Sequence, residues 1–211
     1  MIKNLLFDLG GVIMDIEREN CIKAFKELGM ENIGDFLGDY AQQGVFARLE
    51  EGKISEEQFR DEVRTHCPSG TTDDEIDAAF NEFLTGIPVY RLEMLLQLKE
   101  EYNVYLLSNT NKIMWNSRIA EEFRQIPGMD INSYFDGIVT SFEAHSLKPD
   151  EAIFSYAEET LGISPQETLF LDDSQYNVDA ARNLGFKAAV VSPESDVFGM
   201  IYTTISEYSD K

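Results

Sequence analysis

The sequence predicts an α/β protein with a Rossmann-like parallel sheet core, helices on both faces of that sheet, and an inserted all-α cap domain. Three observations predict it. An apolar strand opens the chain, and about 70 residues of helical pattern follow it. After Pro88 the pattern becomes a regular alternation of helices and strands. Strands joined by helices of this length form right-handed crossovers, which build a parallel sheet.

The first strand covers residues 2–9, because its apolar run before Gly10 is too short for a helix. In the segment that follows, apolar residues recur at helical spacing, and two capping boxes begin at Ser55 and Thr72. Helices are expected here over residues 17–28, 55–66 and 72–83. We expect no strand within residues 16–87.

The alternating pattern after Pro88 completes the sheet. Strands are expected over residues 104–107, 137–140, 168–171 and 187–191, and helices over 89–101, 112–124, 151–161 and 177–184. The segment from residue 194 onward carries no clear pattern. The chain therefore divides into a core, residues 1–15 and 88–211, and a cap, residues 16–87. Because the insertion leaves from the carboxyl end of the first strand, where open α/β sheets bind ligands, we expect the cap to cover that edge.

Composition narrows the classes of function. The apolar and charged fractions, 43% and 27%, are those of an ordinary globular protein. No apolar run is long enough to span a membrane and no signal peptide is evident, so we expect a cytoplasmic protein. We also expect a monomer or weak homodimer. A net charge of −22 argues against binding to nucleic acid or anionic membrane, since both require a basic surface. Cys21 and Cys67 are expected to be reduced thiols.

Polar residues follow the strands at four places. They are Asp8, Ser108-Asn109, Lys148 and Asp172-Asp173. Each group alone is also typical of a turn or a helix cap. Together they should meet at one edge of the sheet, because parallel strands end at the same side.

The chemistry of these groups is complementary. The Asp8, Asp172 and Asp173 carboxylates suit a hard cation such as Mg²⁺. Ser108 and Asn109 can donate hydrogen bonds to phosphoryl oxygens, and Lys148 supplies a positive charge. A carboxylate, a divalent ion, a hydroxyl and an ammonium group at one point are the requirements of phosphoryl transfer. The sequence therefore predicts a site for phosphoryl transfer.

Four segments resemble the motifs of the haloacid dehalogenase-like hydrolases, in order and at suitable spacing. They read FDLGGV at 7–12, LLSNT at 106–110, LKPD at 147–150 and LFLDDSQYNVDAA at 169–181. The helical insertion is similar to the small α-helical cap of this family. The first motif resembles that of a subgroup of phosphatases that includes enzymes acting on a sugar 1-phosphate.

The resemblance implies a phosphatase that acts on a small phosphorylated metabolite, with a role for each of these residues. Asp8 would attack phosphorus to form an aspartyl-phosphate. Mg²⁺ would be held by Asp8, the Gly10 carbonyl and Asp173, with Asp172 beside them. Ser108, Asn109 and Lys148 would hold the transferring phosphoryl group, and Arg48 of the cap is a candidate contact for the substrate.

One position departs from the family pattern. Most of these phosphatases carry a second Asp two residues after the nucleophile as general acid and base, and here that residue is Gly10. Loss of such a group typically removes about 10²–10⁴ in rate. Asp15, Arg48 or Glu50 could replace it, or the substrate could carry an easily departing oxygen. The second possibility favours sugar 1-phosphates or acyl phosphates over primary alkyl phosphates.

Two other classes of function stay open. A metal-free 2-haloacid dehalogenase would use Asp8 to attack carbon, but the extra carboxylates of Asp172 and Asp173 would repel its anionic substrate. A catalytically weak binding or regulatory protein would be consistent with glycine at position 10.

Overall fold

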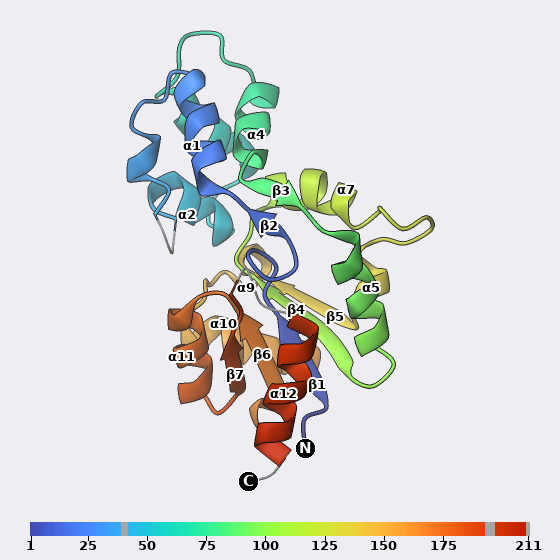
Figure 1. Cartoon of the computed structure of the whole chain (residues 1–211). Coiled ribbons are helices and arrows are strands. Elements are labelled where there is room, and N and C mark those ends of the chain that lie inside the picture. Colours follow the sequence, from blue (N-terminus) through green and yellow to red (C-terminus); the bar gives the residue numbers. More distant parts are fainter. Residues whose placement is uncertain (39–41, 193–196, 210–211) are drawn as a thin grey trace.

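The computed structural model describes residues 1–38, 42–192 and 197–209, and its core is a five-stranded parallel sheet (Figure 1). The strand order is β5-β4-β1-β6-β7, so β1 is central. The strands are β1 (Asn4–Phe7), β4 (Asn103–Ser108), β5 (Gly137–Thr140), β6 (Thr168–Asp172) and β7 (Lys187–Val190). After β5 the chain crosses to the other side of β1 to form β6, and this reversal makes the carboxyl edge beside β1 the switch point.

Helices cover both faces of the sheet, as the sequence predicts. Side chains alternate along β1, so Leu5 and Phe7 pack on one face and Leu6 on the other. The first face is covered by α5 (Val89–Leu98) and α12 (Val197–Ser209), and the second by α10 (Glu151–Leu161) and α11 (Gln175–Asn183). The strands are therefore buried on both sides, which explains their nearly continuous apolar runs.

In the described part of the insertion, four helices and a short 3₁₀ turn form the cap at the top of Figure 1. They are α1 (Arg18–Glu27), the turn Ile33–Asp35, α2 (Gly44–Glu50), α3 (Glu56–Arg64) and α4 (Asp73–Asn81). Their inner faces meet in a cluster of fully buried rings, Phe25, Phe46, Phe59 and Phe80. Ring centroids of contacting pairs lie 5.0–6.3 Å apart, mostly edge to face. The insertion thus has its own packed centre.

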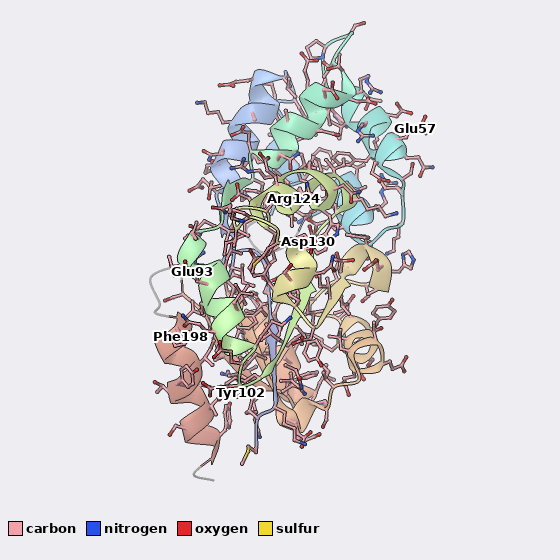
Figure 2. The ribbon with its side chains drawn as sticks, turned by 90° about the vertical axis from the view of Figure 1, so that its right-hand side faces the viewer. Glu57, Glu93, Tyr102, Arg124, Asp130 and Phe198 are labelled. Atoms are coloured by element: carbon pink, nitrogen blue, oxygen red, sulfur yellow. The ribbon has the colours of Figure 1, made fainter. Side chains whose placement is uncertain are left out.

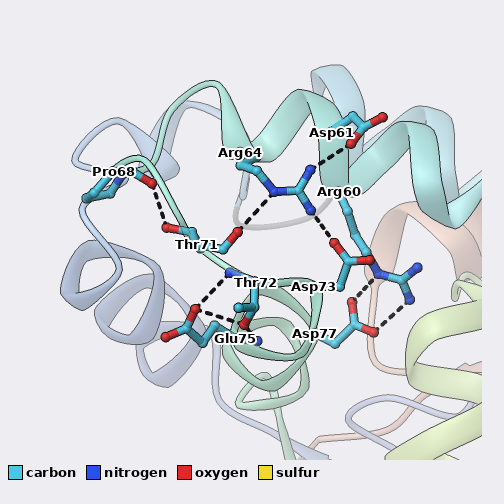
Figure 3. Close-up of polar contacts among 9 residues, drawn as sticks. All are labelled: Arg60, Asp61, Arg64, Pro68, Thr71, Thr72, Asp73, Glu75 and Asp77. Atoms are coloured by element: carbon cyan, nitrogen blue, oxygen red, sulfur yellow. Dashed lines mark hydrogen bonds and ion pairs between the residues drawn. The ribbon is translucent and has the colours of Figure 1, made fainter.

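Polar contacts tie α3 to α4 on the outside of this cluster (Figure 3). The guanidinium of Arg60 donates two hydrogen bonds, of 2.8 and 2.7 Å, to the Asp77 carboxylate. Arg64 pairs with Asp73 near the start of α4. The capping boxes predicted from the sequence are present at the first residues of both helices.

The prediction of no strand within residues 16–87 is wrong at both ends of the insertion. Asp15–Ile16 forms β2 and Leu84–Gly86 forms β3, and the two pair antiparallel where the chain enters and leaves the cap. These strands are too short to show an alternating pattern, and their pairing joins segments far apart in the sequence. Arg91 of α5 fixes the base of this ribbon through a 2.7 Å ion pair with Asp15.

The expected helix over 112–124 is irregular. It consists of α6 (Lys112–Met114), a π-helical turn (Trp115–Ile119) and α7 (Ala120–Glu122). Ser117 donates a 2.6 Å hydrogen bond to the Ile113 carbonyl, which competes with the helical backbone bonds. The same hydroxyl lies 3.1 Å from the side-chain oxygen of Asn81, so the wide turn also meets the cap.

Two short helices, α8 (Ile131–Tyr134) and α9 (Ser141–Ala144), and a 3₁₀ turn (Pro165–Glu167) complete the described core. The unassigned segment at the end of the chain contains α12, and residues 193–196 lie outside the described part. Figure 2 shows the cap above the core, with Glu57 on the outer side of the cap and Tyr102 near the far end. Within the part of the chain that the structure describes, no helix is long and apolar enough to cross a membrane.

Candidate active site

The polar groups that follow the strands meet at the carboxyl edge of the sheet below the cap. Asp8 follows β1, Ser108 ends β4, and Asp172 ends β6. The register aligns Phe7 with Leu106 and Leu171, so these strand ends lie level with one another. The sheet therefore gathers residues from three motifs that are far apart in the sequence.

Lys148 joins two of the carboxylates. Its Nζ lies 2.7 Å from an oxygen of Asp8 and 2.7 Å from an oxygen of Asp172, and its side chain is 1% exposed. Asn109 fixes the backbone of Lys148 from the neighbouring loop, since its amide donates to the Lys148 carbonyl and its oxygen accepts from the Lys148 N–H, at 3.0 and 2.8 Å. Although burial alone would lower the pKa of Lys148, the charges of Asp172 and Asp8 raise it, so the ammonium form is stabilised.

Asp172 is fully buried and both of its carboxylate oxygens already accept hydrogen bonds. One oxygen accepts from Lys148. The other accepts from the Ser174 N–H and the Asn177 side-chain amide, each at 2.9 Å. These bonds fix the carboxylate so that it holds Lys148 in place.

Asp173 is exposed and turns toward the loop after β1. A Cβ on Gly11 would overlap its carboxylate, and Gly11 also has a φ of 71°. Only glycine fits at this position, because any side chain would clash with Asp173 and strain the backbone. The close approach brings Asp173 to the turn that carries Asp8 and Gly10.

The three aspartates form an acidic cluster, in which one oxygen of each lies within 4.8 Å of the others. Burial raises the pKa of Asp8 to about 7; the charge of Lys148 lowers it, and those of Asp172 and Asp173 raise it. Burial and the charge of Asp172 also raise the pKa of Asp173. These three carboxylates have only the Lys148 ammonium to offset their mutual repulsion, so they fit a hard divalent cation, which would favour their ionised forms. Asp8, Gly10 and Asp173 face the open side, whereas Asp172 is occupied by its own hydrogen bonds.

A cavity of about 240 Å³ lies over this cluster, and we call it the active-site cavity. Core residues Asp8, Gly10, Asn109, Leu147, Lys148, Asp173, Ser174 and Asn177 and cap-side residues Ile16, Gly38, Gln42, Glu50 and Phe83 line it. Cavities for drug-sized ligands measure roughly 300–1,000 Å³, so this one suits a small metabolite.

Glu50 is the last residue of α2 and lines the cavity although it is 8% exposed. Burial, followed by the charge of Glu51, raises its pKa to about 8. Glu50 is therefore protonated at neutral pH.

Other residues considered from the sequence lie away from the cavity. Arg48, the expected substrate contact, is 43% exposed and binds the Glu62 carboxylate of α3 at 2.5 and 2.6 Å. Asp15 is paired with Arg91. Ser108 is buried behind Asn109, to whose carbonyl its hydroxyl donates a long hydrogen bond of 3.4 Å.

Sequence reasoning missed Gln42 and Asn177. Asn177 lies one helical turn beyond the Asp172-Asp173 pair, so a helix starting after that pair would have placed its amide near the carboxylates. Gln42 carries no periodic signal in the sequence. Its side-chain oxygen is buried without a hydrogen-bond partner among the described residues.

Comparison with known proteins agrees with this arrangement. Residues 2–185 match the family model of the haloacid dehalogenase-like hydrolases. The D-ribitol-5-phosphate phosphatase of Bacteroides thetaiotaomicron is 37% identical over 187 residues, which cover 89% of this chain and 90% of that protein.

Solved structures of similar proteins share the whole architecture. A haloacid dehalogenase family enzyme of Bacteroides thetaiotaomicron, in complex with magnesium and inorganic phosphate, has a TM-score of 0.88 and 40% identity; the match covers 95% of this chain and 99% of that one. A hydrolase of the same family from Porphyromonas gingivalis has a TM-score of 0.88 and 33% identity, covering 97% and 98%. The chain therefore belongs to the haloacid dehalogenase-like hydrolase family.

Proposed function

We propose that this protein is a Mg²⁺-dependent phosphatase that hydrolyses a small phosphorylated metabolite through an aspartyl-phosphate intermediate. The observation that carries the proposal is the position of Asp8. Its carboxylate stands at the end of the central strand, bonds Lys148 at 2.7 Å, and shares the active-site cavity with Asp173 and the Gly10 turn.

Each residue has a role that its contacts support. Asp8 attacks phosphorus in line with the departing oxygen, and water later releases phosphate from the acyl-phosphate. Lys148 binds a phosphoryl oxygen while Asp172 holds its ammonium group in place. Asn109 fixes the backbone of Lys148 from the neighbouring loop, and the Asn109 loop supplies donors for the remaining phosphoryl oxygens, with Ser108 behind it.

The metal would be held by Asp8, the Gly10 carbonyl and Asp173. When bound, Mg²⁺ neutralises charge on the phosphoryl group and on the carboxylates around it. Asp172 is the weaker candidate for a direct ligand, because both of its oxygens already accept hydrogen bonds.

For the substrate we propose a phosphate ester of a small polyol or sugar. The similarity to a D-ribitol-5-phosphate phosphatase supports a primary phosphate. Gly10 in place of a carboxylate supports a sugar 1-phosphate, whose anomeric oxygen departs more easily than that of an ordinary alcohol. Monomeric or weakly dimeric assembly and a cytoplasmic location stay predictions.

A phosphate-ester panel with and without Mg²⁺ tests the proposal. D-ribitol 5-phosphate, glucose 1-phosphate and glucose 6-phosphate distinguish the two substrate classes. We expect Mg²⁺-dependent turnover that falls on the order of 10⁴-fold or more in Asp8→Asn, because the nucleophile is lost. Turnover that is unchanged in Asp8→Asn would refute the mechanism. Halide release from a 2-haloacid without Mg²⁺ would instead support the dehalogenase, and no turnover of any ester would support a binding protein.

A further inference from the structure

The cap contributes a buried acid to the active-site cavity. Glu50 ends α2 and faces the space that Asp8 and Gly10 face from the core. Among the described residues, its carboxyl group has neither an ion pair nor a hydrogen bond, although it is more than nine-tenths buried. The free-energy cost of burying a carboxyl group without a partner is far lower for its neutral form than for its ionised form. Glu50 therefore presents a proton to the cavity.

The charges around Glu50 keep it in this form. Glu51, on the same helix end, raises its pKa, and that residue is itself paired with Lys53 at 2.8 Å. Across the cavity lie Asp8, Asp173 and Lys148. Lys148 already joins Asp8 to Asp172, so no described cation lining the cavity is left to stabilise an ionised Glu50.

The core has no acidic side chain two residues after Asp8, the position at which most phosphatases of this family carry their proton donor. Gly10 has no side chain, and a Cβ built there would meet only Ile16, at 3.5 Å. Among the titratable groups that line the cavity, the proposed function uses Asp8 as the nucleophile, Asp173 as a metal ligand and Lys148 as a phosphoryl contact. Glu50 is the described acid in the cavity that remains without a role.

We propose that Glu50 is the general acid and base of this phosphatase, delivered by the cap in place of the carboxylate missing at Gly10. The inference rests on the proposed function. As the Asp8 oxygen bonds phosphorus, the bond from phosphorus to the ester oxygen breaks, its electron pair stays on that oxygen, and the Glu50 proton moves to it. The alcohol leaves. Glu50, now a carboxylate, takes a proton from the water that attacks the aspartyl-phosphate, which releases phosphate and restores the Asp8 carboxylate and the protonated Glu50.

The test compares two esters that differ in their need for a proton. p-Nitrophenyl phosphate releases a stable anion, whereas D-ribitol 5-phosphate releases an alkoxide unless it is protonated. In Glu50→Gln we expect kcat/KM to fall about 10²–10⁴-fold for the ribitol ester and less than about tenfold for the nitrophenyl ester. Glu57→Gln, an exposed change on the outer side of the cap, should leave both rates unchanged (Figure 2).

Two further measurements distinguish proton transfer from a structural role. Wild-type turnover of the ribitol ester should decline on the alkaline side as Glu50 loses its proton, and Glu50→Gln should lack this decline. Gly10→Asp in the Glu50→Gln background should restore turnover of the ribitol ester, since the space beside Ile16 accepts a side chain.

Several outcomes would overturn the inference. Equal losses for the two esters, or no loss for either, would exclude proton transfer by Glu50. A rise in KM for the ribitol ester alone, with an unchanged pH profile, would make Glu50 only a binding group for a substrate hydroxyl. If the wild type hydrolyses neither ester and Asp8→Asn changes nothing, the proposed function fails and this inference fails with it. If the nitrophenyl ester is hydrolysed and this turnover is lost in Asp8→Asn, the proposed function holds, and a negative result for Glu50→Gln then counts against the role of Glu50 alone.

Discussion

Glu50→Gln should change the pH dependence of stability even if the protein has no substrate. The pKa of Glu50 is about 8 in the folded protein, against an ordinary value of 4.5. Between these values the folded state keeps a proton that the unfolded state has lost. The free energy of unfolding therefore decreases as pH rises through this range, and the decrease ends above the folded pKa.

The magnitude follows from the width of that range. Within this range each pH unit lowers the free energy of unfolding of the wild type by about 1.4 kcal/mol. From pH 5.5 to 8 this free energy should therefore fall by about 3 kcal/mol relative to that of Glu50→Gln. For a chain of this length that corresponds to a relative shift in Tm of about 6–12 °C. A glutamine side chain cannot ionise, so the variant should be the more stable protein at pH 8.

Urea unfolding of both proteins at several pH values, with EDTA present, measures this difference. Asp8 and Asp173 also titrate, but they are common to both proteins and cancel in the comparison. A difference in unfolding free energy that stays constant from pH 5.5 to 8 would refute the assignment of a buried, protonated Glu50. The slope of unfolding free energy against denaturant should match in the two proteins, which confirms that the same surface is exposed.

Three other predictions concern the cap and the site. Gly52→Ala should lower the free energy of unfolding by about 1–3 kcal/mol, because φ is +63° there and the new Cβ would overlap the Phe142 carbonyl oxygen. Because this contact lies between the cap and the core, turnover should also fall, and small-angle scattering should show a more open particle. Lys148→Met should cost about 3–5 kcal/mol in urea unfolding, since it leaves Asp8 without its buried partner, and stability equal to that of the wild type would contradict this. Ser55→Ala should cost about 1 kcal/mol in thermal unfolding with no change in KM, because it removes the cap of α3 at a residue that does not line the cavity.

The core of the site could be predicted because its residues follow strands. Asp8, Lys148 and Asp172 stand after apolar runs or between clear elements, and parallel strands bring such positions to one edge. In the structure the Lys148 ammonium lies 2.7 Å from each of the two carboxylates. The family resemblance implies that Asp173 is the metal ligand and that Asp172 lies beside it, but the physical reason, the hydrogen bonds that occupy both oxygens of Asp172, could not be predicted from the sequence.

The cap residues show where sequence reasoning ends. Arg48 and Glu50 both belong to α2; both are possible replacements for the missing acid in the sequence, and Arg48 is also the expected substrate contact. Residues two apart on a helix point to opposite sides, so only one of them can face the cavity. The packing of α2 between α3 and the core turns Arg48 toward Glu62 and Glu50 inward. Phe46 and Leu49 mark the buried face of α2, and Glu50 lies one turn after Phe46 on that face, but a glutamate is rarely buried and the pattern alone does not place its carboxyl group in a cavity.

The β2–β3 ribbon makes the cap an exchangeable module. Asp15 pairs with Gly86 and Ile16 with Leu84, so the chain leaves the core and re-enters it at neighbouring points. A transplanted insertion with the same closely spaced ends would meet an intact sheet that still carries Asp8, Lys148 and Asp173. Under the proposals made above, the graft would bring its own acid and its own substrate contacts, so that selection could alter the leaving group without altering the nucleophile. The two strands thus mark the boundary at which a cap with different substrate contacts could be joined to the same phosphate-binding core.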